Sequence, residues 1–124
     1  MQNNLRNKDL GVFENLYGQF SQRESLKFFT QIARNKAFEI EVQKAFNAGR
    51  IKIPIYLSIG TEHIGVGLKY AFQNPLIFAQ HRAHSYYMTF GGNLEALRDE
   101  LLSLPSGCAA GMGGSASIHS PKIG

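Results

Sequence analysis

The sequence predicts an α/β fold that is mostly helical. Its clearest element is a long amphipathic helix from Ser21 to about Ala48, where apolar residues recur at three- and four-residue steps. Further on, LIFAQ at 76–80 is a short apolar run typical of a buried strand, with helical patterns before and after it. A strand between helices is the pattern of an α/β protein, although helices dominate here.

The long helix has a signal at each end. Ser21 with Glu24 three residues later makes a capping box, and Gly49 follows as a helix terminator. The inward face expected from the periodicity consists of Leu26, Phe29, Ala33, Ala37 and Ile40, widened by Phe28, Ile32 and Phe46.

The next segments are shorter. Pro54 interrupts the apolar run 51–59, which predicts an extended segment rather than a central strand. Thr61 is expected to cap a second helix that stops at 74–75, where Asn precedes Pro. Gly65 and Gly67 each cost that helix about 1 kcal/mol relative to Ala, which indicates close packing against another backbone. The inward face expected for this helix consists of Ile64, Leu68, Ala71 and Phe72.

The last helical segments follow the expected strand. Residues 82–90 read as a turn leading into a short helix, and two glycines at 91–92 close it. Asn93 is expected to cap a third helix that Pro105 and Gly107 end. Its apolar face consists of Leu94, Leu97, Leu101 and Leu104. We therefore divide the chain into an N-terminal arm, 1–20, and a domain, 21–124.

Composition excludes several classes of protein. The 124 residues carry a net charge of +4, and the basic excess lies in the first 74 residues, spaced singly among Glu, Gln and Asn. Such spacing is typical of a solvated surface rather than a nucleic-acid site. No stretch approaches the ~20 apolar residues that span a bilayer, and no secretory signal is evident. The single Cys108 cannot form an intrachain disulfide. A cytoplasmic protein is expected, with neither membrane nor nucleic acid as a partner.

Candidate site residues gather in the last third of the chain. Arg82 follows the expected strand, where an α/β sheet presents its site, and His81 and His84 flank it. A guanidinium can bind a diphosphate through paired charged hydrogen bonds, and imidazoles can donate to phosphate or carboxylate. Four glycines follow within 107–114, so these segments could together bind a phosphorylated ligand.

The same residues allow a plainer interpretation. The two histidines could be ordinary loop residues, Arg82 could pair with a nearby carboxylate, and the glycines could form a flexible surface loop. The P-loop pattern GxxxxGK[ST] is absent. Residues and spacing alone leave both interpretations open.

Four segments in order carry a family resemblance: KAFE at 36–39, GTEH at 60–63, HRAHS at 81–85 and GCAAGMGGSAS at 107–117. Together they resemble the N-terminal portion of the alpha subunit of thiamine-diphosphate-dependent 2-oxo acid and acetoin dehydrogenases. The resemblance implies the thiamine-diphosphate-binding fold, represented here by its mostly helical N-terminal portion with the first strand or strands and incomplete at the C-terminus.

The resemblance also implies a cofactor and site residues. Arg82 and His81 would bind thiamine diphosphate, while Tyr56 and His84 would line the substrate end, with His84 as the catalytic residue. The cofactor supplies the carbon nucleophile and the electron sink for cleavage beside a carbonyl group. Mg²⁺ would bridge the diphosphate, but the family's metal-binding motifs do not occur in this sequence, so no metal ligand is assigned.

Some positions depart from the family pattern. Tyr56 and His81 stand where members often carry His and Tyr, and Ser85 replaces a Gly. These changes fall at substrate-facing positions, so the resemblance implies the cofactor more firmly than the substrate.

The expected partners follow from the family. They are a continuation chain, a beta-like subunit and a lipoyl-bearing acyltransferase. Two alternatives stay open: a thiamine-diphosphate-dependent biosynthetic decarboxylase or acyloin-type enzyme, and a noncatalytic helical partner subunit.

Overall fold

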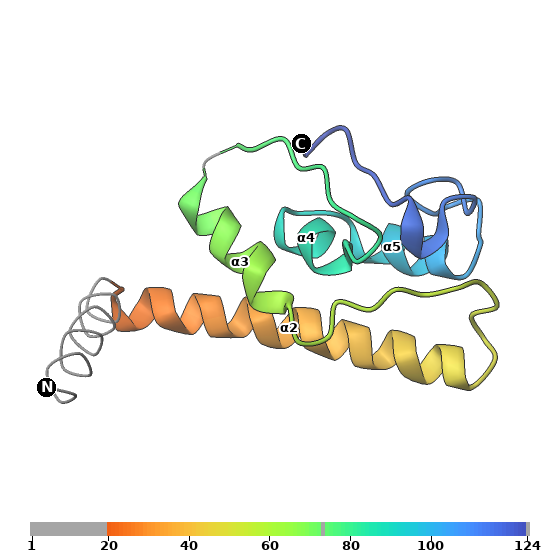
Figure 1. Cartoon of the computed structure of the whole chain (residues 1–124), viewed down its shortest axis with the longest axis horizontal. Helices are drawn as coiled ribbons and strands as arrows, with labels where there is room; N and C mark the ends of the chain where they lie inside the picture. Colours follow the sequence, from red (N-terminus) through yellow and green to blue (C-terminus); the bar gives the residue numbers. More distant parts are fainter. Residues whose placement is uncertain (1–19, 73, 124) are drawn as a thin grey trace, which may run out of the picture. The chain divides into compact units, whose positions relative to one another are not determined.

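The computed structural model of the protein describes residues 20–72 and 74–123. The described residues form helices α2 (Gln22–Asn47), α3 (Glu62–Ala71), α4 (His84–Thr89) and α5 (Leu94–Leu101) and the 3₁₀ turn η1 (Gly114–Ala116) (Figure 1). The chain divides into two compact units, residues 1–30 and 31–124. Helix α2 begins in the first unit and ends in the second. None of the helices in the described ranges is long and apolar enough to cross a membrane.

Both predicted ends of the long helix are confirmed. The Ser21 N–H donates to Glu24 Oε2 at 2.8 Å, and the Glu24 N–H donates to Ser21 Oγ at 3.3 Å, which is the capping box. At the other end, Gly49 takes a φ of +70°, and the Arg50 N–H closes back on the Ala45 carbonyl at 2.9 Å. The expected arm 1–20 lies outside the described residues except for its last residue.

The predicted inward face of this helix is wrong over the second unit. Ala33 and Ala37 are exposed, whereas Asn35, Glu39 and Val42 are buried. Asn35 and Glu39 can lie in the interior because their polar side chains form hydrogen bonds there. The Asn35 amide, for example, donates to Thr89 Oγ1 at 2.8 Å.

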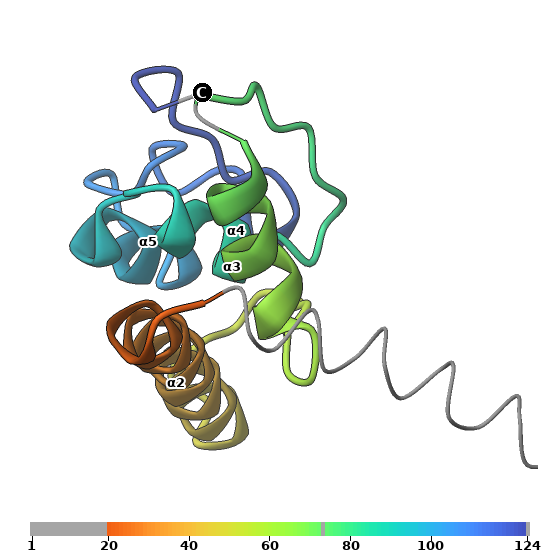
Figure 2. The ribbon, with the colours of Figure 1, turned by 90° about the vertical axis from the view of Figure 1, so that its left-hand side faces the viewer.

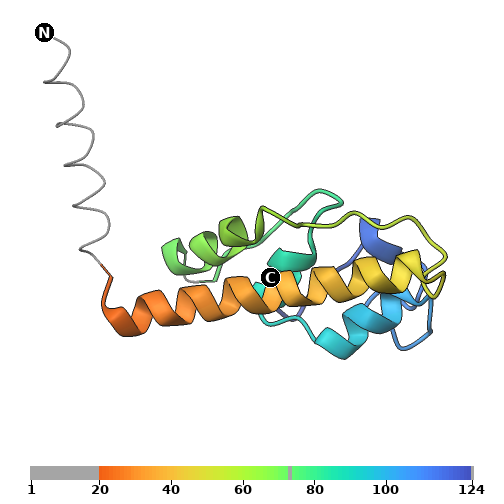
Figure 3. The same cartoon turned by 90° about the horizontal axis from the view of Figure 1, so that it is seen from below.

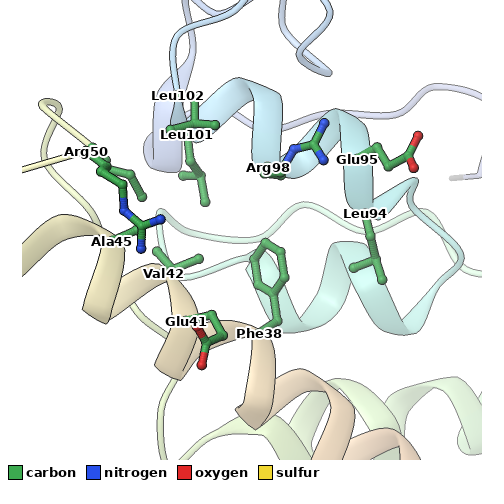
Figure 4. A pocket seen from close by; sticks show the side chains of 11 residues that line it. Phe38, Glu41, Val42, Ala45, Arg50, Leu94, Glu95, Arg98, Leu101 and Leu102 are labelled. Carbon is green, nitrogen blue, oxygen red and sulfur yellow. The ribbon is translucent and has the colours of Figure 1, made fainter. Parts of the chain in front are cut away.

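The apolar core lies between the C-terminal half of α2 and α5. Val42, Ile51 and Leu101 form its buried centre. Figure 4 shows Phe38 and Val42 on α2 facing Leu101 on α5 across a cavity of about 450 Å³. Four charged side chains also line that cavity: Glu41, Arg50, Glu95 and Arg98. Within the second unit, α3, α4 and α5 lie on the same side of α2 (Figures 1 and 2), and from below α3 and α5 flank it (Figure 3).

The expected buried strand at 76–80 is not found, and the prediction of its burial is wrong. Leu76 is 80% exposed and Phe78 is 97% exposed. The segment is irregular and runs along the outside of the second unit (Figure 2). A strand needs a neighbour to pair its backbone, and the described part of the chain contains no other strand that could supply one. The mostly helical character is confirmed, whereas the α/β arrangement is not.

The second predicted helix is confirmed, but not its inward face. Ile64 and Phe72 are exposed, and Gly65 and Val66 are buried. A Cβ at Gly65 would lie 3.5 Å from the Ser85 carbonyl and the Tyr86 Cα, so the predicted close backbone packing is confirmed at that position. It is wrong at Gly67, where no atom would lie within 4 Å.

Two predicted caps differ in outcome. Asn93 Oδ1 accepts the Ala96 N–H at 2.8 Å, so the cap of α5 is confirmed. Thr61 stands before α3, but its hydroxyl donates to the Ser58 carbonyl and does not cap the helix. On α5, Leu97 and Leu101 are buried as predicted, whereas Leu94 is exposed.

Candidate functional site

A buried relay of three polar side chains links distant parts of the second unit. His84 Nδ1 lies 3.1 Å from Glu39 Oε2, and His84 Nε2 lies 2.8 Å from Ser115 Oγ. Glu39 and His84 are 0% exposed, and Ser115 is 1% exposed. The relay therefore connects α2, α4 and η1 away from solvent within this chain.

Counting donors and acceptors assigns the protons. The Tyr56 N–H donates to Ser115 Oγ at 2.9 Å, and the Ser58 N–H donates to Glu39 Oε1 at 3.1 Å. Every donor finds an acceptor if His84 Nδ1–H donates to Glu39 and the Ser115 hydroxyl donates to His84 Nε2. Both carboxylate oxygens of Glu39 then accept a hydrogen bond, which satisfies a buried carboxylate.

Two chains of hydrogen bonds, here called branches, start at the Glu39 carboxylate. One runs through His84 and Ser115 to Tyr56, and the other runs through Ser58. Ser58, whose N–H is held by Glu39, donates its hydroxyl to the Arg82 carbonyl at 3.1 Å. Glu39 thus connects to the backbone of Arg82 through Ser58, and to the backbone of Tyr56 through His84 and Ser115.

At the outer ends of these branches lie the predicted cofactor and substrate residues. The Tyr56 and His81 rings meet edge to face with centroids 4.5 Å apart, and both residues are partly open to solvent. Arg82 is exposed and lines a cavity of about 650 Å³ beside α3 and the segment 75–80. Of the described residues that line this cavity, Arg82 is the charged one. The volume falls in the range of small-molecule pockets.

The structure places His84 differently from its neighbours in the sequence. Predicted as a catalytic residue at the substrate end, it is completely buried, and both ring nitrogens have partners inside the chain. That role stays a prediction. The present arrangement favours an indirect effect on the substrate end, through Ser115 and Tyr56.

The glycine-rich segment surrounds a carboxylate rather than an open phosphate site. Glu100 is fully buried, and its two oxygens accept four backbone N–H groups at 2.7–2.9 Å. The donors are Ala109, Gly111, Gly113 and Gly114. Those N–H groups are therefore occupied by a residue of the same chain.

Burial and hydrogen bonding act in opposite directions on Glu100. Burial disfavours the charged carboxylate, but the backbone N–H groups outweigh it and hold the pKa of Glu100 below its ordinary value. Cys108, in the same segment, is affected mainly by burial, which raises the pKa of its thiol. The thiol form is thereby favoured, which gives no support to a nucleophilic role.

Sequence reasoning missed four residues of this arrangement: Glu39, Ser58, Glu100 and Ser115. Glu39 fell within a segment that carried the resemblance, but its place on a helix gave no reason to expect burial. Glu100 had a usable signal, because a carboxylate near the end of a helix, a few residues before a glycine-rich segment, can accept the N–H groups of that segment. Throughout the described ranges, no group of three or more His, Cys, Asp or Glu side chains could hold a metal ion.

Comparison with known proteins identifies relatives. The chain is 30% and 32% identical over 100 residues to the E1 component subunits alpha-1 and alpha-2 of mitochondrial pyruvate dehydrogenase from Arabidopsis thaliana. It is 28% identical over 103 residues to the E1 component subunit alpha of pyruvate dehydrogenase from Zymomonas mobilis. These matches cover 80%, 80% and 82% of this chain and 26%, 25% and 29% of the relatives.

The chain is related to the alpha subunits of pyruvate dehydrogenase. The predicted resemblance to the N-terminal portion of such a subunit is confirmed. The chain spans about a quarter of the length of these relatives. No protein-family model matches it, and no solved structure matches it.

Proposed function

We propose that the chain contributes to the cofactor site of a thiamine-diphosphate-dependent 2-oxo acid dehydrogenase, as part of an alpha subunit. The relationship to pyruvate dehydrogenase alpha subunits carries this proposal. Acetoin is the second substrate class that the sequence segments allow.

Arg82 is the proposed anchor for the diphosphate. Its side chain is exposed beside a cavity of suitable size, and its carbonyl is held by Ser58, so the backbone is fixed while the guanidinium is free to bind. A planar guanidinium can donate two parallel hydrogen bonds to phosphate oxygens. We place His81 beside it, because its ring is already positioned against Tyr56.

We propose that Tyr56 lines the substrate end of the site and that the buried His84 affects this end indirectly. Tyr56 is 38% exposed, and its backbone N–H is fixed by Ser115, which leaves its ring available at the surface. His84 would influence that end through Ser115, to which its Nε2 is bound.

The remaining parts of the site would come from outside this chain. We propose that Mg²⁺ and its ligands, a beta-like subunit and a continuation chain complete it, and that a lipoyl-bearing acyltransferase receives the product. The exposed side chains of Leu76 and Phe78 support association, since isolated proteins rarely leave such apolar segments uncovered. We also propose a cytoplasmic location, although the Arabidopsis relatives are named as mitochondrial.

Calorimetry with thiamine diphosphate and Mg²⁺ tests this function. One charged hydrogen-bonding group contributes about 1.5–3 kcal/mol, whereas a micromolar dissociation constant needs roughly 8 kcal/mol. We therefore expect the isolated chain to bind the cofactor weakly or not at all. Binding in the micromolar range is expected once the continuation and beta-like chains are added.

Two results would contradict the proposal. Tight Mg²⁺-dependent binding by the chain alone would show that the metal ligands lie within this chain, which contradicts the proposal that they come from outside it. An assembled complex that contains this chain and binds no thiamine diphosphate would rule out a cofactor-binding role.

A further inference from the structure

We infer that Glu39 is a positioning residue that fixes the cofactor end and the substrate end of the proposed site through two separate branches. The inference rests on the proposed function for the roles of Arg82 and Tyr56. The branches themselves are features of the hydrogen bonding. Glu39 touches neither exposed end and acts through other residues.

The first branch reaches the cofactor end. Glu39 Oε1 accepts the Ser58 N–H at 3.1 Å, and the Ser58 hydroxyl donates to the Arg82 carbonyl at 3.1 Å. Ser58 is 1% exposed, so water does not compete for these groups within this chain. Arg82 lies two residues before the start of α4, and this hydrogen bond fixes the backbone from which its side chain extends.

The second branch reaches the substrate end. Glu39 Oε2 accepts from His84, whose Nε2 accepts from Ser115, and Ser115 Oγ accepts the Tyr56 N–H at 2.9 Å. Tyr56 in turn contacts His81. The directions of the two hydrogen bonds made by His84 depend on Glu39 being an acceptor only, because the carboxylate fixes the proton on His84 Nδ1.

Glutamine at position 39 would reverse the two hydrogen bonds made by His84, while the Tyr56 N–H would still donate to Ser115. Its carbonyl oxygen could still accept the Ser58 N–H, but its amide would present donors to His84 Nδ1. His84 would then carry its proton on Nε2 and donate to Ser115. The Ser115 hydroxyl proton would lose its acceptor.

The histidine tautomer is the most direct readout. In ¹⁵N NMR spectra of the full chain, we expect wild-type His84 to be protonated on Nδ1 and Glu39→Gln to move the proton to Nε2. A side chain that only fills space would leave the tautomer unchanged. Protonation of Nε2 in the wild type, or the same tautomer in both proteins, would overturn the inference without any cofactor being present.

Two further variants separate the branches in the assembled enzyme. Ser58→Ala removes the bond to the Arg82 carbonyl and should weaken cofactor binding about three- to tenfold, the range for one neutral hydrogen bond. Substrate KM should stay within about twofold of wild type. Ser115→Ala removes the acceptor for the Tyr56 N–H. It should raise the substrate KM and leave cofactor affinity close to that of wild type. Ser120→Ala, which lies in neither branch, is the control for loss of a serine hydroxyl.

The outcomes distinguish the inference from the proposed function. Ser58→Ala and Ser115→Ala could lower the melting temperature and change neither the cofactor dissociation constant nor the substrate KM, or change both constants equally. Either result would show that the two branches do not position separate ends. If the wild-type assembly binds no cofactor, the proposed function fails, and the tautomer measurement alone then decides whether Glu39 orients the buried relay.

Discussion

Replacing Glu100 by alanine is expected to lower the free energy of unfolding by roughly 3–5 kcal/mol, because a buried N–H that loses its acceptor costs about 1–3 kcal/mol. Four backbone N–H groups of the glycine-rich segment depend on this carboxylate. Water can replace some of these bonds, since several of the donor residues are only partly buried. Urea denaturation followed by circular dichroism measures the loss.

Glu100→Gln should be nearly as harmful, because its amide would face two N–H donors. Glu95→Gln, an exposed position on the same helix, is the matched control and should change stability little.

The stability that Glu100 contributes should depend on pH. Its pKa is lowered in the folded protein, so its stabilisation is complete above the unfolded value of about 4.3. It is lost as the pH falls through the folded value. The difference in free energy of unfolding between wild type and Glu100→Gln should therefore become smaller in acid. A Glu100→Ala protein as stable as the Glu95→Gln control would refute this account of the segment.

Gly107→Ala is expected to destabilise the protein by about 3 kcal/mol, at the upper end of the range for overpacking. A Cβ at Gly107 would lie 2.6 Å from the Glu100 Cα and 2.8 Å from the Glu100 N. Backbone atoms of a helix cannot move aside as a flexible side chain can, so the substitution must displace the segment that binds the Glu100 carboxylate.

Gly67→Ala is the control for the Gly107 substitution. It lies in α3 with open space around the new methyl group, and it should raise stability by about 0.5–1 kcal/mol through helix propensity. Thermal and urea unfolding of both proteins should show shifts of opposite sign. Equal tolerance of the two substitutions would contradict the packing of the glycine-rich segment on α5.

The predictions from sequence succeeded where a local signal decides the structure. Ser21 with Glu24 fixed the start of α2, and Asn93 fixed the start of α5. Both are contacts between residues three positions apart, so the sequence contains all of their partners.

The predictions failed where the deciding partner is distant. The interior face of α2 is set by Asn35 and Glu39. Besides a local bond from Gln31 to Asn35, these two side chains make hydrogen bonds to residues 19 to 54 positions away. Apolar periodicity cannot detect a polar residue that is buried because it is satisfied. The segment 76–80 failed for a related reason, since its apolar pattern suits a strand only when another strand is present to pair with it.

The sequence pointed to the exposed residues of the candidate site, whose roles stay predictions, but not to the buried residues behind them. Arg82, His81 and Tyr56 do lie at the surface, with Tyr56 against His81. His84 was expected beside them, but its ring points inward to Glu39 and Ser115. His81 lies before α4 and His84 is its first residue, and the sequence gave no means of telling that the first points outward and the second inward.

The central claim is that Arg82 binds the diphosphate, and the most direct test is the cofactor dissociation constant of Arg82→Lys in the assembled enzyme. Lysine keeps the charge but loses the planar pair of donors. We predict that binding weakens about tenfold or more, equivalent to about 1.4 kcal/mol, with an unchanged melting temperature. Arg50 lines the separate cavity between α2 and α5 and not the one beside Arg82, so Arg50→Lys should bind the cofactor as wild type does. If Arg82→Lys leaves cofactor affinity intact and lowers the melting temperature, Arg82 is a structural residue and the assignment is wrong.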